Sequence, residues 1–174
     1  MKIALIGTHG IGKTTLAHDI MTRLKKRGID AGFLSEIVRE CPFPVNENTT
    51  RKSQLWIMLM QIIKELEFEE RYGVLICDRS VLDSYCYYAK KFGKSEVLEP
   101  LIKKHLETYA LIIKVPLRDG FLKDDKFRST DKKFQKDIDE KMDGLLKKFG
   151  VNFASISSEE ENEKIIGKII KKLN

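Results

Sequence analysis

Residues 7–14 read Gly7-Thr8-His9-Gly10-Ile11-Gly12-Lys13-Thr14 and fit the pattern G-x-x-x-x-G-K-[ST]. They directly follow the apolar run Ile3-Ala4-Leu5-Ile6, where a buried first strand is expected to end. Glycines let the backbone curl with its N–H groups inward, and a helix that begins near Lys13 points its positive end at the same place. The stretch therefore predicts a loop that binds nucleotide phosphates. The alternative is a glycine-rich turn between a strand and a helix that holds no ligand.

Each polar group in this loop has an expected task. Lys13 would reach the β- and γ-phosphates, and Thr14 would place its hydroxyl on Mg²⁺. Thr15, the next helix residue, can add a phosphate contact, whereas His9 has no separate role. We expect the nucleotide to contact the whole stretch, namely Gly7, Thr8, His9, Gly10, Ile11, Gly12, Lys13, Thr14 and Thr15.

Length and composition predict that residues 1–174 form a single domain. The chain is 42% hydrophobic and 33% charged, which is enough for one core and too little for two. Its net charge of +6 suits an anionic ligand, but basic and acidic residues are interspersed, so a nucleotide explains the charge without a nucleic acid. The three cysteines lack C-x-x-C spacing, which indicates neither a disulfide framework nor a zinc site. With no signal peptide and no membrane span expected, the predicted location is the cytoplasm.

Strands and helices are expected to alternate along the chain. Apolar runs predict strands at 3–6, 31–34, 74–77, 110–115 and 151–154, and helical spacing predicts helices at 13–27, 49–71, 81–92, 96–106, 131–149 and 159–173. The longest helix, 49–71, is predicted by apolar residues at Leu55, Leu59, Ile62, Ile63 and Leu66. Alternation of this kind predicts a three-layer α/β fold with a mainly parallel sheet of about five strands flanked by helices. The charged segment 117–131 is typical of a loop or lid.

In a parallel sheet, ligands bind beyond the carboxyl ends of the strands, so polar residues that follow the apolar runs should meet in one crevice. The candidates are Glu36 and Arg39 after the second strand, Asp78, Arg79 and Ser80 after the third, and Arg118 after the fourth.

Asp78 and Arg79 each have two readings. Asp78 ends an apolar strand, where an acidic residue could hold Mg²⁺ directly or through water, or it could cap the following helix, as Ser80 could too. Arg79 could contact a transferred phosphoryl group or an acceptor phosphate, because its rigid fork matches phosphate oxygens, or it could form a surface ion pair.

Glu36 is the candidate base for an attacking hydroxyl group, or a residue that binds the acceptor. The neighbouring Arg39 and Glu40 could be no more than a solvated helix face. Residues 42–46 together with Gln54, Trp56 and Gln61 could wall an acceptor pocket, although Trp56 is the more typical core residue.

The charged segment offers Lys123, Lys126 and Arg128. A cation that closes over a triphosphate neutralises charge and excludes water, and Arg128 is our candidate for that role. The alternative is a solvated run of charges.

Taken together, these residues resemble the P-loop nucleoside and nucleotide kinases, including thymidylate kinases, deoxynucleoside kinases and the nicotinamide riboside kinases of a broad AAA-like set. The loop at 7–14 carries the resemblance, and Asp78-Arg79-Ser80 looks like the D-R-[YS] or E-R-S element whose arginine meets phosphates. Ser35-Glu36 resembles the carboxylate that acts as base in deoxynucleoside kinases, and 123–131 resembles an arginine-bearing lid. The chain differs from the thymidylate kinase pattern at Ser80, where those enzymes often carry Tyr or Phe. Between Gln54 and Gln61 we find no clear match to the residues that bind thymine in those enzymes.

The resemblance implies an Mg²⁺-dependent enzyme that moves the γ-phosphoryl group of ATP to a small acceptor, a nucleoside, nucleotide or related riboside. Catalysis would fall to Lys13, Glu36, Arg79 and Arg128, and Mg²⁺ to Thr14 and Asp78. Two alternatives stay open: an NTPase that hydrolyses ATP or GTP, and a nucleotide-dependent binding or regulatory module. We expect no membrane or nucleic-acid partner, and a homodimer is the alternative to a monomer.

Overall fold

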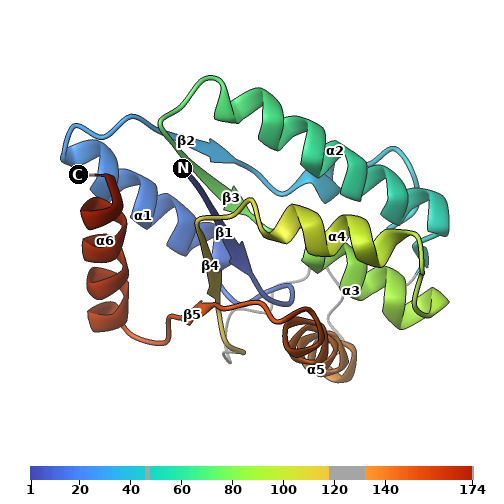
Figure 1. The fold of residues 1–174 in the computed structure, drawn as a ribbon. Coiled ribbons are helices and arrows are strands. Elements are labelled where there is room, and N and C mark those ends of the chain that lie inside the picture. The colour runs from blue at the N-terminus through green and yellow to red at the C-terminus, as the bar shows by residue number, and fades with distance from the viewer. Residues whose placement is uncertain (46–47, 118–131, 174) are drawn as a thin grey trace.

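The computed structural model describes residues 1–45, 48–117 and 132–173 (Figure 1). Five parallel strands form one sheet in the order β2-β3-β1-β4-β5. The strands are β1 (Lys2–Ile6), β2 (Ala31–Leu34), β3 (Val74–Asp78), β4 (Leu111–Lys114) and β5 (Ala154–Ser155). The helices are α1 (Lys13–Lys26), the 3₁₀ turn η1 (Ile37–Glu40), α2 (Arg51–Glu69), α3 (Val81–Phe92), α4 (Leu98–Leu106), α5 (Lys132–Phe149) and α6 (Glu159–Leu173). The predicted three-layer α/β fold is confirmed.

Helices cover both faces of the sheet, and the central strand β1 shows why. All five of its residues are buried, with successive side chains on opposite faces. Ile3 and Leu5 pack toward α1 and α6, whereas Ala4 and Ile6 pack toward the layer that contains α2, α3, α4 and α5. Figure 1 shows α1 and α6 together on one side and the other four helices on the opposite side. Because both faces of this strand are buried, every residue along it must be apolar or otherwise tolerate burial. This is why the strand could be predicted from a continuous apolar run.

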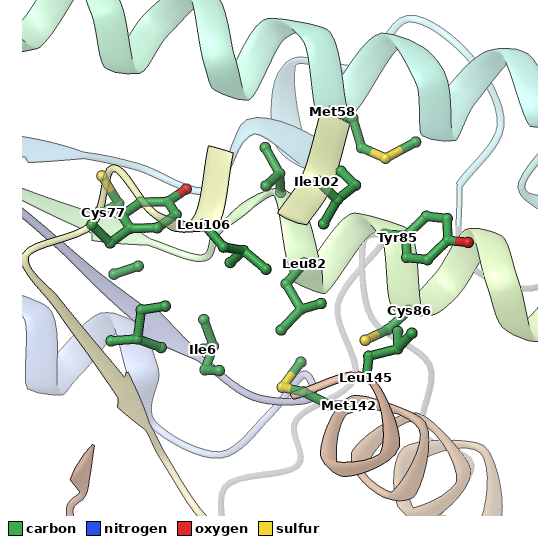
Figure 2. Close-up of a cluster of buried hydrophobic side chains, with 14 of the residues drawn as sticks. Ile6, Met58, Cys77, Leu82, Tyr85, Cys86, Ile102, Leu106, Met142 and Leu145 are labelled. Atoms are coloured by element: carbon green, nitrogen blue, oxygen red, sulfur yellow. The ribbon is translucent and has the colours of Figure 1, made fainter. Parts of the chain in front are cut away.

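The layer between the sheet and α2 to α5 holds the larger of the two cores (Figure 2). Met58 from α2, Leu82 from α3, Ile102 from α4 and Met142 from α5 extend toward one another there. Each of these four side chains is no more than 1% exposed. These contacts fix the positions of α2 and α3, and both helices contribute residues to the candidate site.

The last strand begins later than predicted. The expected strand at 151–154 is found at Ala154–Ser155, where it pairs with Ile113 and Lys114 of β4. The preceding residues instead close helix α5, because Gly150 takes a positive φ of 66° and Val151 donates its N–H to the carbonyl of Leu146. This is the hydrogen-bond pattern of a Schellman motif, and it uses the residues assigned to the strand start.

Helix α2 forms where its apolar spacing predicts it, but most of those apolar residues face outward. Leu55, Leu59, Ile63 and Leu66 are between 41% and 58% exposed. The buried side of α2 carries Ser53, Gln54, Ile57, Met58, Gln61 and Glu65 instead. In the ranges that the structure describes, no helix is both long and apolar enough to cross a membrane.

Candidate active site

Two glycines give the loop between β1 and α1 its shape. A Cβ atom on Gly7 would lie 2.7 Å from Ile11 Cδ1 and 2.8 Å from the carbonyl oxygen of Val115, so a side chain has no room there. Gly12 precedes α1 with a φ of 87°, a left-handed conformation that glycine adopts without strain. No side chain caps α1, so the N–H groups of its first turn, which point toward the loop, are left for another acceptor. The loop can therefore receive an anion.

Lys13 brings a cation into this loop. Its side chain donates a hydrogen bond from Nζ to the carbonyl oxygen of Thr8, and the residue is only 5% exposed. Burial, together with the nearby charge of Arg79, lowers the pKa of Lys13 to about 8. The ammonium group is thus mainly charged at neutral pH but is poorly solvated, which favours its interaction with phosphate oxygens.

Asp78 contacts the first turn of α1. Its Oδ2 accepts a hydrogen bond of 2.5 Å from Thr14 Oγ1. Ser80 caps α3, because its hydroxyl accepts from the N–H of Leu82, and the N–H of Ser80 in turn donates to the Asp83 carboxylate. The cap of α3 is therefore Ser80, and the Asp78 carboxylate lies beside the Thr14 hydroxyl.

This pair of oxygen donors is suited to Mg²⁺. The ion prefers oxygen ligands and is commonly held by one or two protein groups together with substrate phosphates. A hydroxyl and a carboxylate at the mouth of a phosphate loop fit that pattern. Within the described ranges no cluster of three or more His, Cys, Asp or Glu side chains could hold a metal, so a site made wholly of such protein ligands does not occur there.

Arg79 lies between two buried carboxylates. Its Nε donates to Glu36 Oε1, and its Nη1 lies 3.6 Å from Asp83 Oδ1. Burial works against the charged guanidinium, but Glu36 and Asp83 hold the pKa of Arg79 well above its usual value. Glu36 also faces Arg39, whose Nε is 3.5 Å from Oε2. Of the two predicted readings of Arg79, the surface ion pair does not describe this geometry, because its side chain is only 11% exposed.

The backbone at Arg79 is itself strained. Its φ of 93° lies in a region that residues other than glycine rarely occupy. Its N–H donates to the carbonyl of Leu5 over 3.0 Å, and its carbonyl accepts from Gln61 Nε2 over 3.4 Å. Both contacts hold the peptide in this conformation and place the side chain above the ends of β1 and β3.

Three residues on later helices complete the surroundings, and sequence analysis did not find them. The wholly buried Asp83 accepts from the N–H of Gly7 over 3.1 Å, which joins α3 to the phosphate loop. The hydroxyl of Tyr87 lies 2.9 Å from His9 Nδ1, and its ring lies 5.7 Å from the guanidinium of Arg79. Gln135 donates to the carbonyl of His9 over 2.7 Å. Of the three, only Asp83 could have been predicted from the sequence, because the spacing Ser80-x-x-Asp83 is that of a capping box at a helix N-terminus.

Two adjoining pockets share the same central residues. The first has a volume of about 300 Å³ and is lined by His9 to Thr15 together with Glu36, Asp78 and Arg79. The second, of about 30 Å³, is lined by His9, Glu36, Ile37, Val38, Gln54, Ile57, Gln61, Arg79, Ser84 and Tyr87. His9, Glu36 and Arg79 line both pockets. The ion pair of Glu36 and Arg79 thus lies where the two spaces meet.

Most predicted site residues are brought together, with clear exceptions. Gln54 and Gln61 line the second pocket, whereas Trp56 is half-buried and packs against the core. Among the residues described, 42–45 line neither pocket. Arg128 and most of the predicted lid lie outside the described residues, as do Asn46, Arg118, Lys123 and Lys126.

Comparison with known proteins supports this architecture. A family model described as an AAA domain matches residues 2–164. A NadR protein in complex with NR aligns with a TM-score of 0.73 and 21% identity, over 98% of this chain and 50% of that one. A deoxyadenosine kinase from M. mycoides with bound dATP aligns with a TM-score of 0.65 and 17% identity, over 98% of this chain and 99% of that one. Another NadR structure, in complex with NAD and AMP-PNP, aligns with a TM-score of 0.68 and 17% identity, over 98% of this chain and 48% of that one.

These likenesses establish the fold, which the chain shares with the NadR proteins and with the deoxyadenosine kinase. The chain spans about half the length of the NadR chains. No curated protein sequence gives a significant match to it.

Proposed function

Since the chain belongs to the AAA domain family, we propose that it is an Mg²⁺-dependent phosphotransferase that moves the γ-phosphoryl group of ATP to a nucleoside, nucleotide or related riboside. One observation carries this proposal: the phosphate-loop pocket and the pocket beside it meet at Glu36 and Arg79. A donor and an acceptor placed in these two spaces would face each other across that pair. Phosphoryl transfer needs such positioning more than it needs covalent chemistry.

On the donor side, Lys13 and the N–H groups of the loop bind and neutralise the phosphates of ATP. Thr14 and Asp78 would hold Mg²⁺, which supplies charge neutralisation to the transferred group when bound. Arg79 then stabilises negative charge that develops between donor and acceptor, because its guanidinium is buried and held in place on both sides.

On the acceptor side, Glu36 accepts the proton of the attacking hydroxyl group. Its bond from Arg79 Nε keeps the carboxylate oriented toward the junction of the pockets. Gln54 and Gln61 offer amide groups that can bind the edge of a base, and Tyr87 offers an aromatic face. This lining has the mixed chemistry of a nucleoside.

A second candidate function rests on the size of the acceptor pocket. Its volume of about 30 Å³ leaves room for no more than a few water molecules and is far below the roughly 300 Å³ or more of typical small-molecule sites. A nucleoside must therefore displace part of the wall when it binds. Water fits the pocket without rearrangement, which favours an NTPase as the alternative.

Transfer of a labelled phosphoryl group distinguishes these candidates. The protein is incubated with γ-labelled ATP, Mg²⁺ and pooled nucleosides, nucleotides and ribosides, and the labelled products are separated. Label in a small organic molecule is the result expected of a kinase. Label only in inorganic phosphate rules out the kinase for the compounds tested and supports the NTPase, whereas ATP that is bound but not consumed indicates a regulatory module.

The variant Lys13→Ala is the control for the donor site. We expect it to lose ATP–Mg²⁺ affinity, because the loop then lacks its buried cation. An unchanged affinity would show that the donor site has been placed incorrectly.

A further inference from the structure

A further cavity, which we call the β4 cavity, lies at the opposite end of strand β4 from the phosphate loop. Its volume of about 570 Å³ falls within the roughly 300–1,000 Å³ of typical small-molecule sites. Leu111 and Ile112, at the start of β4, line it, whereas the carbonyl of Val115, just beyond the end of β4, is the group that crowds Gly7. Among the described residues, none lines both this cavity and a pocket of the candidate active site. The β4 cavity is therefore a separate space.

The inner wall of the β4 cavity belongs to the folded core. Leu106 at the end of α4, Ile112 in β4 and Phe149 at the end of α5 line it, and they are 4%, 3% and 9% exposed. Figure 1 shows β4 between α6 on one side and α4 and α5 on the other. Lys172 of α6 donates from Nζ to the carbonyl of Ala110 over 2.9 Å, which joins α6 to the segment before β4. The cavity is thus formed before any ligand binds.

Phe153 adds an exposed aromatic ring to this apolar wall. The residue lies between α5 and β5, lines the cavity and is 44% exposed. Within the described ranges, its ring stacks on no other aromatic side chain. Aromatic side chains pack well against flat apolar rings, and an exposed one beside a cavity offers that contact to a ligand.

Positive charge gathers around the same cavity. Lys103 of α4 and Lys168 and Lys172 of α6 line it, and the acidic residue among the lining residues described is Glu107. In the parts of the chain that the structure describes, no carboxylate forms an ion pair with these three lysines, whereas Glu107 accepts a hydrogen bond from Lys104 over 2.7 Å. Three positive charges and one negative charge leave a net charge of +2 at the cavity. A cluster of like charges with this excess favours an anionic ligand.

We propose that the β4 cavity binds an organic anion that carries an aromatic ring and about two negative charges, the chemistry of an aryl phosphate or a nucleoside monophosphate. The ring packs against Phe153 and the apolar wall, and the anionic group accepts hydrogen bonds from the lysines. Lys172 can take part because an ammonium group has three donors and its bond to Ala110 uses one of them. An inorganic anion would leave the apolar wall uncovered, and a neutral aromatic compound would leave the lysines unpaired. The combined lining therefore selects a ligand with both features.

Titration of the full chain with 1-naphthyl phosphate, followed by methyl NMR, tests the proposal. At about pH 7.5 this probe has an aromatic ring and close to two negative charges. The methyl resonances of Leu106, Leu111 and Ile112, which line the β4 cavity, should shift and saturate with a Kd of about 100 μM or below. Ile11 and Ile57 line the two pockets of the candidate active site and report binding there instead. Inorganic phosphate should bind the cavity at least tenfold more weakly than the probe, because it lacks the ring.

Variants at the charged side and at the aromatic ring separate the two parts of the site. Lys168→Glu should weaken probe binding about tenfold or more, because it turns an attraction into a repulsion. Lys136→Glu, which makes the same change at an exposed lysine outside the cavity lining, should leave the Kd within about twofold. Phe153→Ala should weaken binding about tenfold, and Phe153→Tyr, which keeps the ring, should bind like the wild type. The spectrum of each variant without probe shows whether it is folded.

Three outcomes overturn the proposal. The first is a titration up to about 1 mM probe in which the resonances of the β4 cavity stay in place or only Ile11 and Ile57 respond. The second is an equal loss of affinity in Lys168→Glu and Lys136→Glu, which would show an effect of net charge alone. The third is binding of inorganic phosphate as tight as that of the probe, which would leave the ring without a role. Because binding is read at methyl groups of the β4 cavity, each outcome is independent of whether the chain transfers phosphate.

Discussion

Thr14 Oγ1 donates a hydrogen bond of 2.5 Å to Asp78 Oδ2, which joins the first turn of α1 to the end of β3. The contact brings together two oxygen donors from residues far apart in the sequence, one on each side of the phosphate loop. Hydroxyl and carboxylate oxygens are typical Mg²⁺ ligands, so this pair makes the proposed metal site testable.

Asp78→Asn should raise the Mg²⁺ concentration needed for half-maximal turnover and lower kcat by about 100-fold, because a neutral amide holds the ion poorly. Thr14→Val should act in the same direction. Turnover measured against Mg²⁺ concentration provides the readout. Thr22→Val is the control, since Thr22 is an exposed threonine on the same helix. If both site variants kept the wild-type Mg²⁺ dependence, the ion would bind elsewhere.

Lys13 should make nucleotide binding depend on pH in a particular way. Burial and Arg79 lower the pKa of Lys13 to about 8, so at pH 9 this side chain is mainly neutral before ATP binds. Triphosphate oxygens favour the charged ammonium, and binding at pH 9 should therefore take up roughly one proton, whereas binding at pH 7 should take up little. Calorimetry in buffers of different ionisation enthalpy measures this uptake. Lys13→Arg should abolish the uptake at pH 9, because a guanidinium stays charged. Equal uptake at the two pH values would contradict this role.

Glu36 should matter for turnover much more than for ATP binding. Glu36→Gln removes the charge that can accept a proton, and we expect kcat to fall by about 100-fold or more while the Kd for ATP changes little. Glu40→Gln, an exposed glutamate at the end of the same 3₁₀ turn, should leave both values unchanged. The substitution also weakens the contact with buried Arg79, so a thermal melt should accompany the kinetics. A folded Glu36→Gln protein with wild-type kcat would assign proton transfer to another group.

The fold was predictable because its signals are local. Alternating apolar runs and helical spacings lie within short windows, and the glycines of the phosphate loop are required by the backbone, as the crowded position of Gly7 shows. Polar residues at strand ends were also found, because parallel strands bring Glu36, Asp78 and Arg79 to one edge of the sheet.

Other features depend on tertiary contacts that no local window contains. Asp83 and Tyr87 belong to the site only because α3 packs against the phosphate loop. In α2, spacing predicted a helix without showing which side faces the core. Burial of Gln61 and Glu65 runs against the usual preference for apolar cores, and hydrogen bonds formed only in the folded chain allow it.

Glu65 is the centre of a buried polar network that should dominate the stability of this region. Lys2 Nζ lies 3.0 Å from Glu65 Oε2, and His105 Nε2 lies 2.7 Å from the same oxygen. Gln61 and Tyr109 each donate to Oε1 over 2.7 Å. Burial alone would raise the pKa of Glu65, but His105 and Lys2 lower it overall. Burial likewise opposes the charge of Lys2, yet Glu65 raises the pKa of that lysine.

Replacing Glu65 by Leu should lower the free energy of unfolding by about 3–5 kcal/mol at pH 7, because it leaves the buried Lys2 charge without its main partner. Glu67→Gln, at an exposed position on the same helix, should change it by less than about 0.5 kcal/mol. Urea unfolding measures both effects. The lowered pKa of Glu65 stabilises the fold above pH 4.5, and the raised pKa of Lys2 does so below pH 10.5. The difference between wild type and Glu65→Leu should therefore be largest between these values and shrink as the pH falls below about 4. A difference that stayed constant down to pH 3 would mean that packing, and not the charge of Glu65, sets the stability there.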